Sequence, residues 1–189
     1  MRTFLHFARH LIGIDPPSTQ VAADEQQALV RLAREAQVVV ELGCFEGATT
    51  LLLAQASPGV VHTVDPFYAG RLGVCWGKLI AERQVSGLPP GKVSIHQMLS
   101  WEAAAMVDGV DLLFVDADHS FESIRKDWEA WVPRVKPGGH IALHDSLVAP
   151  NSRNRLGSMQ FYEEVVKSDG RVRVVAEVGC MAVVLRVGP

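Results

Sequence analysis

The sequence predicts an α/β sandwich in which helices cover both faces of a mostly parallel, seven-stranded sheet with an antiparallel edge strand. Two observations lead to this expectation. Short apolar runs rich in β-branched residues alternate with stretches of helical periodicity, as buried parallel strands and crossover helices do. After five alternations, two strand-like runs joined by Gly179-Cys180 end the chain, which is typical of an antiparallel hairpin.

The elements are expected in the following order. Residues 2–12 form a short helix that ends at Gly13 and the breaker at residues 15–18, and residues 24–36 form a second helix with apolar side chains every three to four positions. The predicted strands are 38–42, 60–64, 93–96, 111–115, 140–144, 172–178 and 181–187. The predicted helices between them are 49–57, 71–87, 100–107, 120–131 and 158–167, and residues 136–139 are predicted to form a turn.

Length and composition limit the possible functions. A chain of 189 residues suits a single domain, in which we expect a helical N-terminal segment, 1–20, and a core, 21–189. A net charge of -3 argues against nucleic-acid binding, and no apolar run is long enough to cross a membrane. The three cysteines show no Cys-x-x-Cys spacing, which predicts a reduced, cytoplasmic protein.

The loop after the first strand, Glu41-Leu-Gly-Cys-Phe-Glu-Gly47, favours a nucleotide-type cofactor. Gly43 allows a tight turn and a close ligand, and we expect Gly47 to let the next helix pack closely on the strand. Phe45 excludes the dinucleotide fingerprint, and Glu41 would repel a pyrophosphate. Asp65, at the end of the second strand, could hold a ribose diol or simply cap its loop. Together these residues favour an adenosine-containing cofactor with a positive end.

Acidic residues and histidines gather at the ends of the fourth and fifth strands. Asp116, Asp118 and His119 follow one strand, and His144 and Asp145 end the other. Three carboxylates and two imidazoles at one edge of a sheet are costly unless a charge neutralises them. A divalent cation would do so, and Asp116 and Asp145 are its natural pair of carboxylate ligands.

Several motifs resemble those of class I S-adenosylmethionine-dependent methyltransferases. Residues 39–50 resemble the first motif of that family, and Val-Asp-Pro-Phe at 64–67 resembles the second. The segments 114–122 and 136–145 are more specific and resemble the small bacterial O-methyltransferases related to catechol-type and macrolide-sugar enzymes. The resemblance covers about residues 25–187. It implies a Rossmann-like fold, S-adenosylmethionine as methyl donor and a small hydroxylated acceptor.

The resemblance also implies a cofactor site. The glycine loop would line the methionine part, Asp65 would hold the ribose hydroxyls, and the two residues after it would flank the adenosine. Ser100 and Trp101 stand where the adenine is usually met, although Trp101 could equally be a core residue. The implied cofactor-binding residues are Glu41, Gly43, Phe45, Gly47, Asp65, Pro66, Phe67, Ser100, Trp101 and Asp116.

The implied metal site departs from the family pattern. Relatives place ligands at the positions of Asp116 and Asp145, and a third beside Asp145, where this chain has His144 before and Ser146 after. Magnesium is the expected ion, but His144 as a ligand would favour manganese, iron or zinc. Alternatively, water or Ser146 completes the shell. His119 matches the position of the catalytic base, a role suited to its ordinary pKa of ~6.5, or it caps the following helix.

These observations predict a divalent-metal-assisted O-methyltransferase. The alternatives are a metal-independent methyltransferase of the same fold and a nucleotide-binding module without chemistry. Acceptor specificity is expected from the N-terminal segment and from residues 149–157, which include Arg153 and Arg155. A homodimer is also expected.

Overall fold

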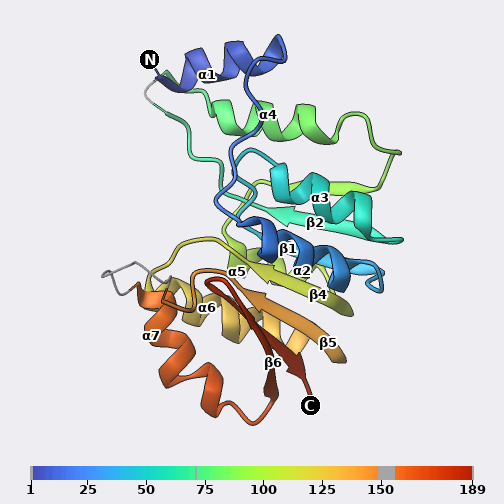
Figure 1. Ribbon diagram of the computed structural model, residues 1–189, viewed down its shortest axis with the longest axis vertical. Coiled ribbons are helices and arrows are strands. Elements are labelled where there is room, and N and C mark those ends of the chain that lie inside the picture. The colour runs from blue at the N-terminus through green and yellow to red at the C-terminus, as the bar shows by residue number, and fades with distance from the viewer. Residues whose placement is uncertain (1, 71, 149–155, 189) are drawn as a thin grey trace.

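The computed structural model describes residues 2–70, 72–148 and 156–188. Its centre is a seven-stranded sheet in the order β3-β2-β1-β4-β5-β7-β6, with helices on both faces (Figure 1). The strands are β1 (Val38–Leu42), β2 (Val60–Val64), β3 (Val93–His96), β4 (Val110–Val115), β5 (Val135–Leu143), β6 (Val172–Val178) and β7 (Met181–Arg186). The α-helices are α1 (Arg2–Leu11), α2 (Ala23–Ala33), α3 (Ala48–Ala56), α4 (Trp76–Val85), α5 (Ser100–Ala103), α6 (Phe121–Trp131) and α7 (Gly157–Glu164). Three short 3₁₀ turns follow α5, α6 and α7: Ala104–Met106, Val132–Arg134 and Val166–Ser168.

The strand order creates a switch point at the centre of the sheet. From β1 the chain builds outward through β2 to β3, then returns to β4 on the other side of β1 and continues to β5. All four pairings among these five strands are parallel, whereas β7 is antiparallel to both β5 and β6. The predicted mostly parallel sheet with antiparallel pairing at one edge is thus confirmed, with the reversed strand β7 lying just inside the edge strand β6. Ligands of such sheets bind where the direction of strand addition reverses, here between β1 and β4.

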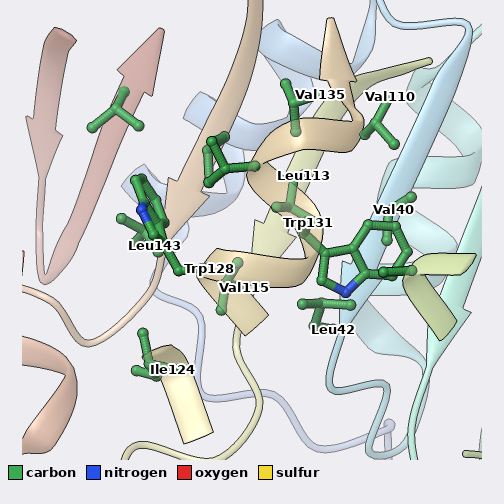
Figure 2. Packing of buried hydrophobic residues seen from close by; sticks show 14 of the residues in the cluster. Val40, Leu42, Val110, Leu113, Val115, Ile124, Trp128, Trp131, Val135 and Leu143 are labelled. Atoms are coloured by element: carbon green, nitrogen blue, oxygen red, sulfur yellow. The ribbon is translucent and has the colours of Figure 1, made fainter. Parts of the chain in front are cut away.

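Alternating side chains of the central strands supply two cores, one on each face of the sheet. Val39 and Phe114 belong to the core that α2 and α3 cover. Val40, Leu42 and Leu113 point to the opposite face and pack beneath α6 (Figure 2). Trp128 and Trp131 of α6 fill much of this second core. The largest fully buried side chains include Trp131, Tyr162 and Phe161 in this second core and Phe114 in the first.

Two elements begin at positions that the sequence does not predict. The predicted turn at 136–139 is an excursion within β5, because Val135 pairs with Val110 and His140 pairs with Leu112. Only Asp111 of β4 therefore faces these four residues, and a salt bridge of 2.7 Å to Lys136 closes the excursion. Helix α4 begins at Trp76 rather than at residue 71, since the chain after Asp65 forms a loop before it can turn helical.

Helix α1 lies outside the sandwich, against α4 (Figure 1). Phe4 and Phe7 contact the Trp76 ring at centroid distances of 5.2 and 5.0 Å. No helix among the described residues is long and apolar enough to cross a membrane.

Candidate active site

A cavity of about 400 Å³ lies at the carboxyl ends of the parallel strands, over the switch point. The loops after β1, β2 and β4 and the start of α5 supply most of its wall. The predicted site residues that line it are Gly43, Phe45, Asp65, Pro66, Ser100, Trp101, Asp116 and His119. The sequence thus predicts the part of the wall that these strand ends supply, because the ends of parallel strands meet at one edge of a sheet.

Gly43 joins the glycine loop closely to the end of β4. Its φ of +95° lies in the left-handed region, and a Cβ there would stand 2.1 Å from the carbonyl oxygen of Asp116. The Asp116 backbone N–H donates to the carbonyl of Leu42 at 2.8 Å, which fixes this approach. Only glycine fits here, so the close turn expected from the sequence is present.

Asp65 braces the glycine loop. Its Oδ2 accepts the backbone N–H groups of Cys44 and Phe45 at 3.1 and 2.9 Å, and its Oδ1 accepts that of Phe67 at 2.7 Å. Each carboxylate oxygen has two lone pairs, so the side chain keeps acceptor capacity toward the cavity that it lines. The loop role, one of the two alternatives left by the sequence, is present, and the same side chain lines the cavity.

Three predicted cofactor residues lie behind the wall rather than in it. Phe67 is 4% exposed and packs in a small core with Cys44 and Ala81, because its φ of +46° turns the chain inward. Gly47 packs against helix α4 and not against a strand: a Cβ there would be 2.9 Å from the Cα of Ala81. The expectation of helix-on-strand packing at Gly47 is therefore wrong.

The third, Glu41, is fully buried below the loop. Its Oε2 accepts hydrogen bonds from the hydroxyls of Thr50 and Thr63, while Oε1 has no partner. Burial raises the pKa of Glu41 to about 8, although the two threonine hydroxyls oppose this. A largely protonated carboxyl supports the loop from beneath and does not repel a ligand, which corrects the electrostatic role expected from the sequence.

Asp116, His119, His144 and Asp145 form the candidate metal cluster at one side of the cavity. One ligand atom from each of the four lies within 4.8 Å of the others. The Nε2 atom of His119 is 2.8 Å from Asp145 Oδ2, and Nδ1 of His144 is 3.1 Å from Asp116 Oδ1. Both nitrogen atoms are buried and neither makes a well-oriented hydrogen bond. The structure thus brings together the pair of strand ends that the sequence predicts.

His119 does not cap the helix that follows it. Ser120 is the N-cap of α6, because its hydroxyl accepts the backbone N–H of Ser123, and Asp118 accepts that of Ser120. The capping alternative for His119 is therefore wrong. The close carboxylate of Asp145 raises the pKa of His119, and burial lowers it less.

His144 is buried beneath the cluster, with 2% of its side chain exposed. Burial opposes its protonation, but Asp116 and Asp145 outweigh burial and raise its pKa to about 10. His119 and His144 together hold the pKa of the Asp145 carboxyl far below its ordinary value. Ser146 turns away, since its hydroxyl donates to the backbone carbonyl of His144. Of the two third-ligand alternatives, the side chain of His144 is the one that faces the carboxylates.

Several lining residues escape prediction from the sequence. Ser18, Thr19 and Gln20 close the cavity from the N-terminal side, although nothing in their composition signals a ligand. Tyr68 and Leu99 also line it. Arg153 and Arg155, expected in a substrate loop, lie outside the described residues.

Comparison with known proteins decides the family. A family model described as a methyltransferase domain matches residues 40–146, more than half of the chain. The chain belongs to this methyltransferase family. A nucleotide-binding module without chemistry, one of the alternatives above, is therefore not supported. A curated relative, the uncharacterized protein y4gI of Sinorhizobium fredii, is 32% identical over 56 residues, which cover 30% of this chain but only 6% of that protein.

Solved structures show the same fold. The O-methyltransferase TomG from Streptomyces achromogenes, in complex with SAM, gives a TM-score of 0.69 at 19% identity and covers 100% of this chain and 91% of its own. An O-methyltransferase from Bacillus cereus, in complex with SAH, gives a TM-score of 0.65 at 18% identity. The match covers 98% of this chain and 91% of the Bacillus cereus chain. A methyltransferase from Geobacter sulfurreducens gives a TM-score of 0.66 at 17% identity. The match covers 100% of this chain and 89% of the Geobacter sulfurreducens chain. The methyltransferase fold that the motifs imply is confirmed.

Proposed function

We propose that this methyltransferase transfers the methyl group of S-adenosylmethionine to a hydroxyl group of a small molecule, with a divalent cation held by the candidate metal cluster. One observation carries the proposal: the cavity beside the glycine loop and the candidate metal cluster share a wall at Asp116. A cofactor in the cavity would thus bring its reactive end close to a group that can activate a hydroxyl. The SAM and SAH complexes of TomG and the Bacillus cereus enzyme support this choice of methyl donor.

The cofactor would be held by the residues of the cavity wall. Its sulfonium supplies an electrophilic methyl group. Asp65 would accept hydrogen bonds from the ribose diol, while the exposed ring of Phe45 and the Trp101 ring offer apolar surface to the adenosine. The cavity volume of about 400 Å³ falls within the ordinary range for small-molecule sites.

The candidate metal cluster fits a divalent cation. Two carboxylates and two imidazoles within 4.8 Å match the donor set of a first-row transition ion, and two of the nitrogen atoms lack hydrogen-bond partners. Asp116, His144 and Asp145 would hold the ion. When bound, it would lower the pKa of the acceptor hydroxyl.

His119 would receive the proton of that hydroxyl. It lines the cavity, with 31% of its side chain exposed, whereas His144 is buried. Its Nε2 atom has no hydrogen bond and would take the proton, and Asp145 at 2.8 Å would stabilise the imidazolium. The acceptor oxygen would then bond to the methyl carbon as the S–CH₃ bond opposite breaks and S-adenosylhomocysteine leaves, with the cavity walls holding both reactants in line.

A metal-independent methyltransferase is the second candidate. The short approach of His119 to Asp145 favours it, because a histidine oriented by a carboxylate can act as a base without a cation. Activity in the presence of a chelator would then be unchanged, whereas the leading proposal requires its loss and its return on addition of Mn²⁺.

The Asp145→Asn variant tests the leading proposal. Asparagine keeps the shape of the side chain and tolerates the left-handed φ of +49° at this position, but it removes the charge. We expect methyl transfer from S-adenosylmethionine to a panel of small phenols and sugars to be abolished. Cofactor affinity, measured by titration calorimetry, should stay nearly unchanged. An equal loss of cofactor binding would show that Asp145 does not act through the metal.

The acceptor, the cellular compartment and the oligomeric state complete the proposed function. A small acceptor and no nucleic acid are proposed on the size of the cavity and the slight negative charge. The three cysteines are free thiols, which supports a reducing compartment such as the cytoplasm. The homodimer stays a prediction.

A further inference from the structure

The candidate metal cluster is backed by a second group of buried side chains from distant parts of the chain. Glu25 of α2, His144 and Cys180 also bring ligand atoms within 4.8 Å of one another, and His144 belongs to both groups. Glu25 is 1% exposed. None of the motifs of the cofactor or metal site includes it, and its place in the first turn of a helix suggests only a capping role.

Glu25 accepts hydrogen bonds from several donors. The backbone N–H of Ala22 donates to Oε2 at 2.7 Å, and the backbone N–H of Cys180 donates to Oε1 at 2.7 Å. The thiol of Cys180 donates to Oε1 at 3.1 Å. Each carboxylate oxygen thus accepts a backbone N–H, and Glu25 serves as an acceptor on every side that these bonds occupy.

This carboxylate determines which nitrogen of His144 carries a proton. The Nε2 atom of His144 lies 3.2 Å from Glu25 Oε2. Because the other polar neighbours of this carboxylate are all donors, Nε2 is assigned as the donor of this bond as well. Nδ1, on the other side of the ring, faces Asp116 at 3.1 Å and Asp145 at 3.6 Å, so it is the nitrogen that would exchange its proton for a cation.

We infer that Glu25 is a positioning residue that holds His144 with its proton on Nε2, so that Nδ1 serves as a metal ligand and the cluster selects an imidazole-binding transition ion over Mg²⁺. The inference rests on the proposed metal-assisted function and names the chemistry of its ion. A carboxylate that accepts from the second nitrogen of a ligand histidine fixes the ring and makes it a better donor. Imidazole suits manganese, iron, cobalt and zinc, whereas Mg²⁺ prefers an all-oxygen shell.

A metal between Glu25, His144 and Cys180 is the competing arrangement, and two observations disfavour it. The oxygens of Glu25 are already taken by donors, two of which are backbone N–H groups. The Cys180 thiol is itself one of these donors, because it donates to Glu25 Oε1 at 3.1 Å. These residues thus support His144 from behind.

The test compares Co²⁺ and Mg²⁺ affinities of the unaltered protein with those of Glu25→Gln. A glutamine has an NH₂ group in place of one carboxylate oxygen. Because NH₂ is a donor, it cannot accept the hydrogen bonds that this oxygen accepts in the unaltered protein. We expect the unaltered protein to bind Co²⁺ more tightly than Mg²⁺. Glu25→Gln should weaken Co²⁺ binding by about 10–100-fold. Glu177→Gln is the control, because it makes the same substitution at an exposed carboxylate that accepts a hydrogen bond from the Tyr162 hydroxyl, away from the cluster. Its Co²⁺ affinity should not change.

A double variant separates positioning from general damage. If Glu25 acts through His144, then Glu25→Gln should cause no further loss of Co²⁺ affinity in a His144→Ala background. A further loss equal to that in the single variant would overturn the inference. A thiolate-to-cobalt charge-transfer band that disappears in Cys180→Ala would also overturn it, because the ion would then lie on the other side of His144.

A measurement on the unaltered protein keeps the inference testable if the variants fail to fold. In the Zn²⁺-loaded protein, ¹⁵N spectra of the histidines should show His144 protonated at Nε2 and coordinated through Nδ1. Coordination through Nε2 would overturn the inference. If the unaltered protein binds no Co²⁺ or Zn²⁺, the metal part of the proposed function fails with it. If it binds them and Glu25→Gln is unchanged, the role of Glu25 alone fails.

Discussion

At the scale of single residues, the site depends on positions where an ordinary side chain would not fit. Gly43 combines a left-handed backbone with a carbonyl oxygen where its Cβ would stand. Asp145 also adopts a positive φ, of 49°, which turns its carboxylate toward the two histidines at the end of β5. Such strained positions persist only where the surrounding structure holds them.

Gly43→Ala should therefore damage both folding and binding. We expect the free energy of unfolding to fall by about 1–3 kcal/mol from the backbone strain, and further from the clash with Asp116. Affinity for S-adenosylhomocysteine should fall as well, because the loop must move. Urea denaturation and titration calorimetry measure the two effects.

Gly73→Ala is the control for that substitution. Its φ of +72° imposes a similar backbone cost, but a Cβ there would meet nothing within 4 Å. Gly73→Ala should lose stability without losing cofactor affinity. Equal behaviour of the two variants would show that the close approach of Gly43 to β4 is unimportant.

At the scale of elements, helix α1 is tied to the glycine loop by polar contacts as well as by its aromatic contacts with α4. His6 Nε2 lies 3.0 Å from Glu46 Oε2, and its Nδ1 lies 3.3 Å from Asp15. The same oxygen of Glu46 accepts the backbone N–H of Ser18 at 2.6 Å. Because Ser18 lines the cavity, these contacts connect the position of α1 to the wall of the site.

This connection should weaken as the pH rises. The hydrogen bond to Glu46 raises the pKa of His6 above 6.5, with a further contribution from Asp15 that burial only partly offsets. Protonated His6 therefore stabilises the folded state, and this stabilisation is complete below pH ~6.5. It is lost as the pH rises through the pKa that His6 has in the folded state. We expect amide exchange across α1, corrected for its intrinsic rate, to be faster at pH 8 than at pH 6. His6→Gln should remove this difference, and its persistence in the variant would exclude His6 as the cause.

At the scale of the whole molecule, the sequence predicts what depends on local pattern. Apolar runs and helical periodicity predict the seven strands and most of the helices. The rule that parallel strands end at one edge predicts that Asp116 and Asp145 meet. The start of α4 and the excursion in β5 depend instead on loop geometry and register, which the pattern does not encode.

What the sequence does not predict arises from burial and from contacts between distant segments. Glu41 and Phe67 carry the expected motif, yet the fold turns both away from the cavity. Glu25 reaches Cys180 across 155 positions of the chain, and no local signal marks either residue as a neighbour of the metal cluster. Ser18 lines the cavity, and its backbone N–H is held by Glu46, a residue 28 positions away in the chain.

A crystal structure with S-adenosylhomocysteine and Mn²⁺ tests the central claim most directly. We expect the nucleoside in the cavity beside Gly43 and Asp65, and an anomalous manganese peak coordinated by Asp116, His144 Nδ1 and Asp145. Manganese at saturating concentration without a peak at this cluster, or S-adenosylhomocysteine bound away from the glycine loop, would contradict it.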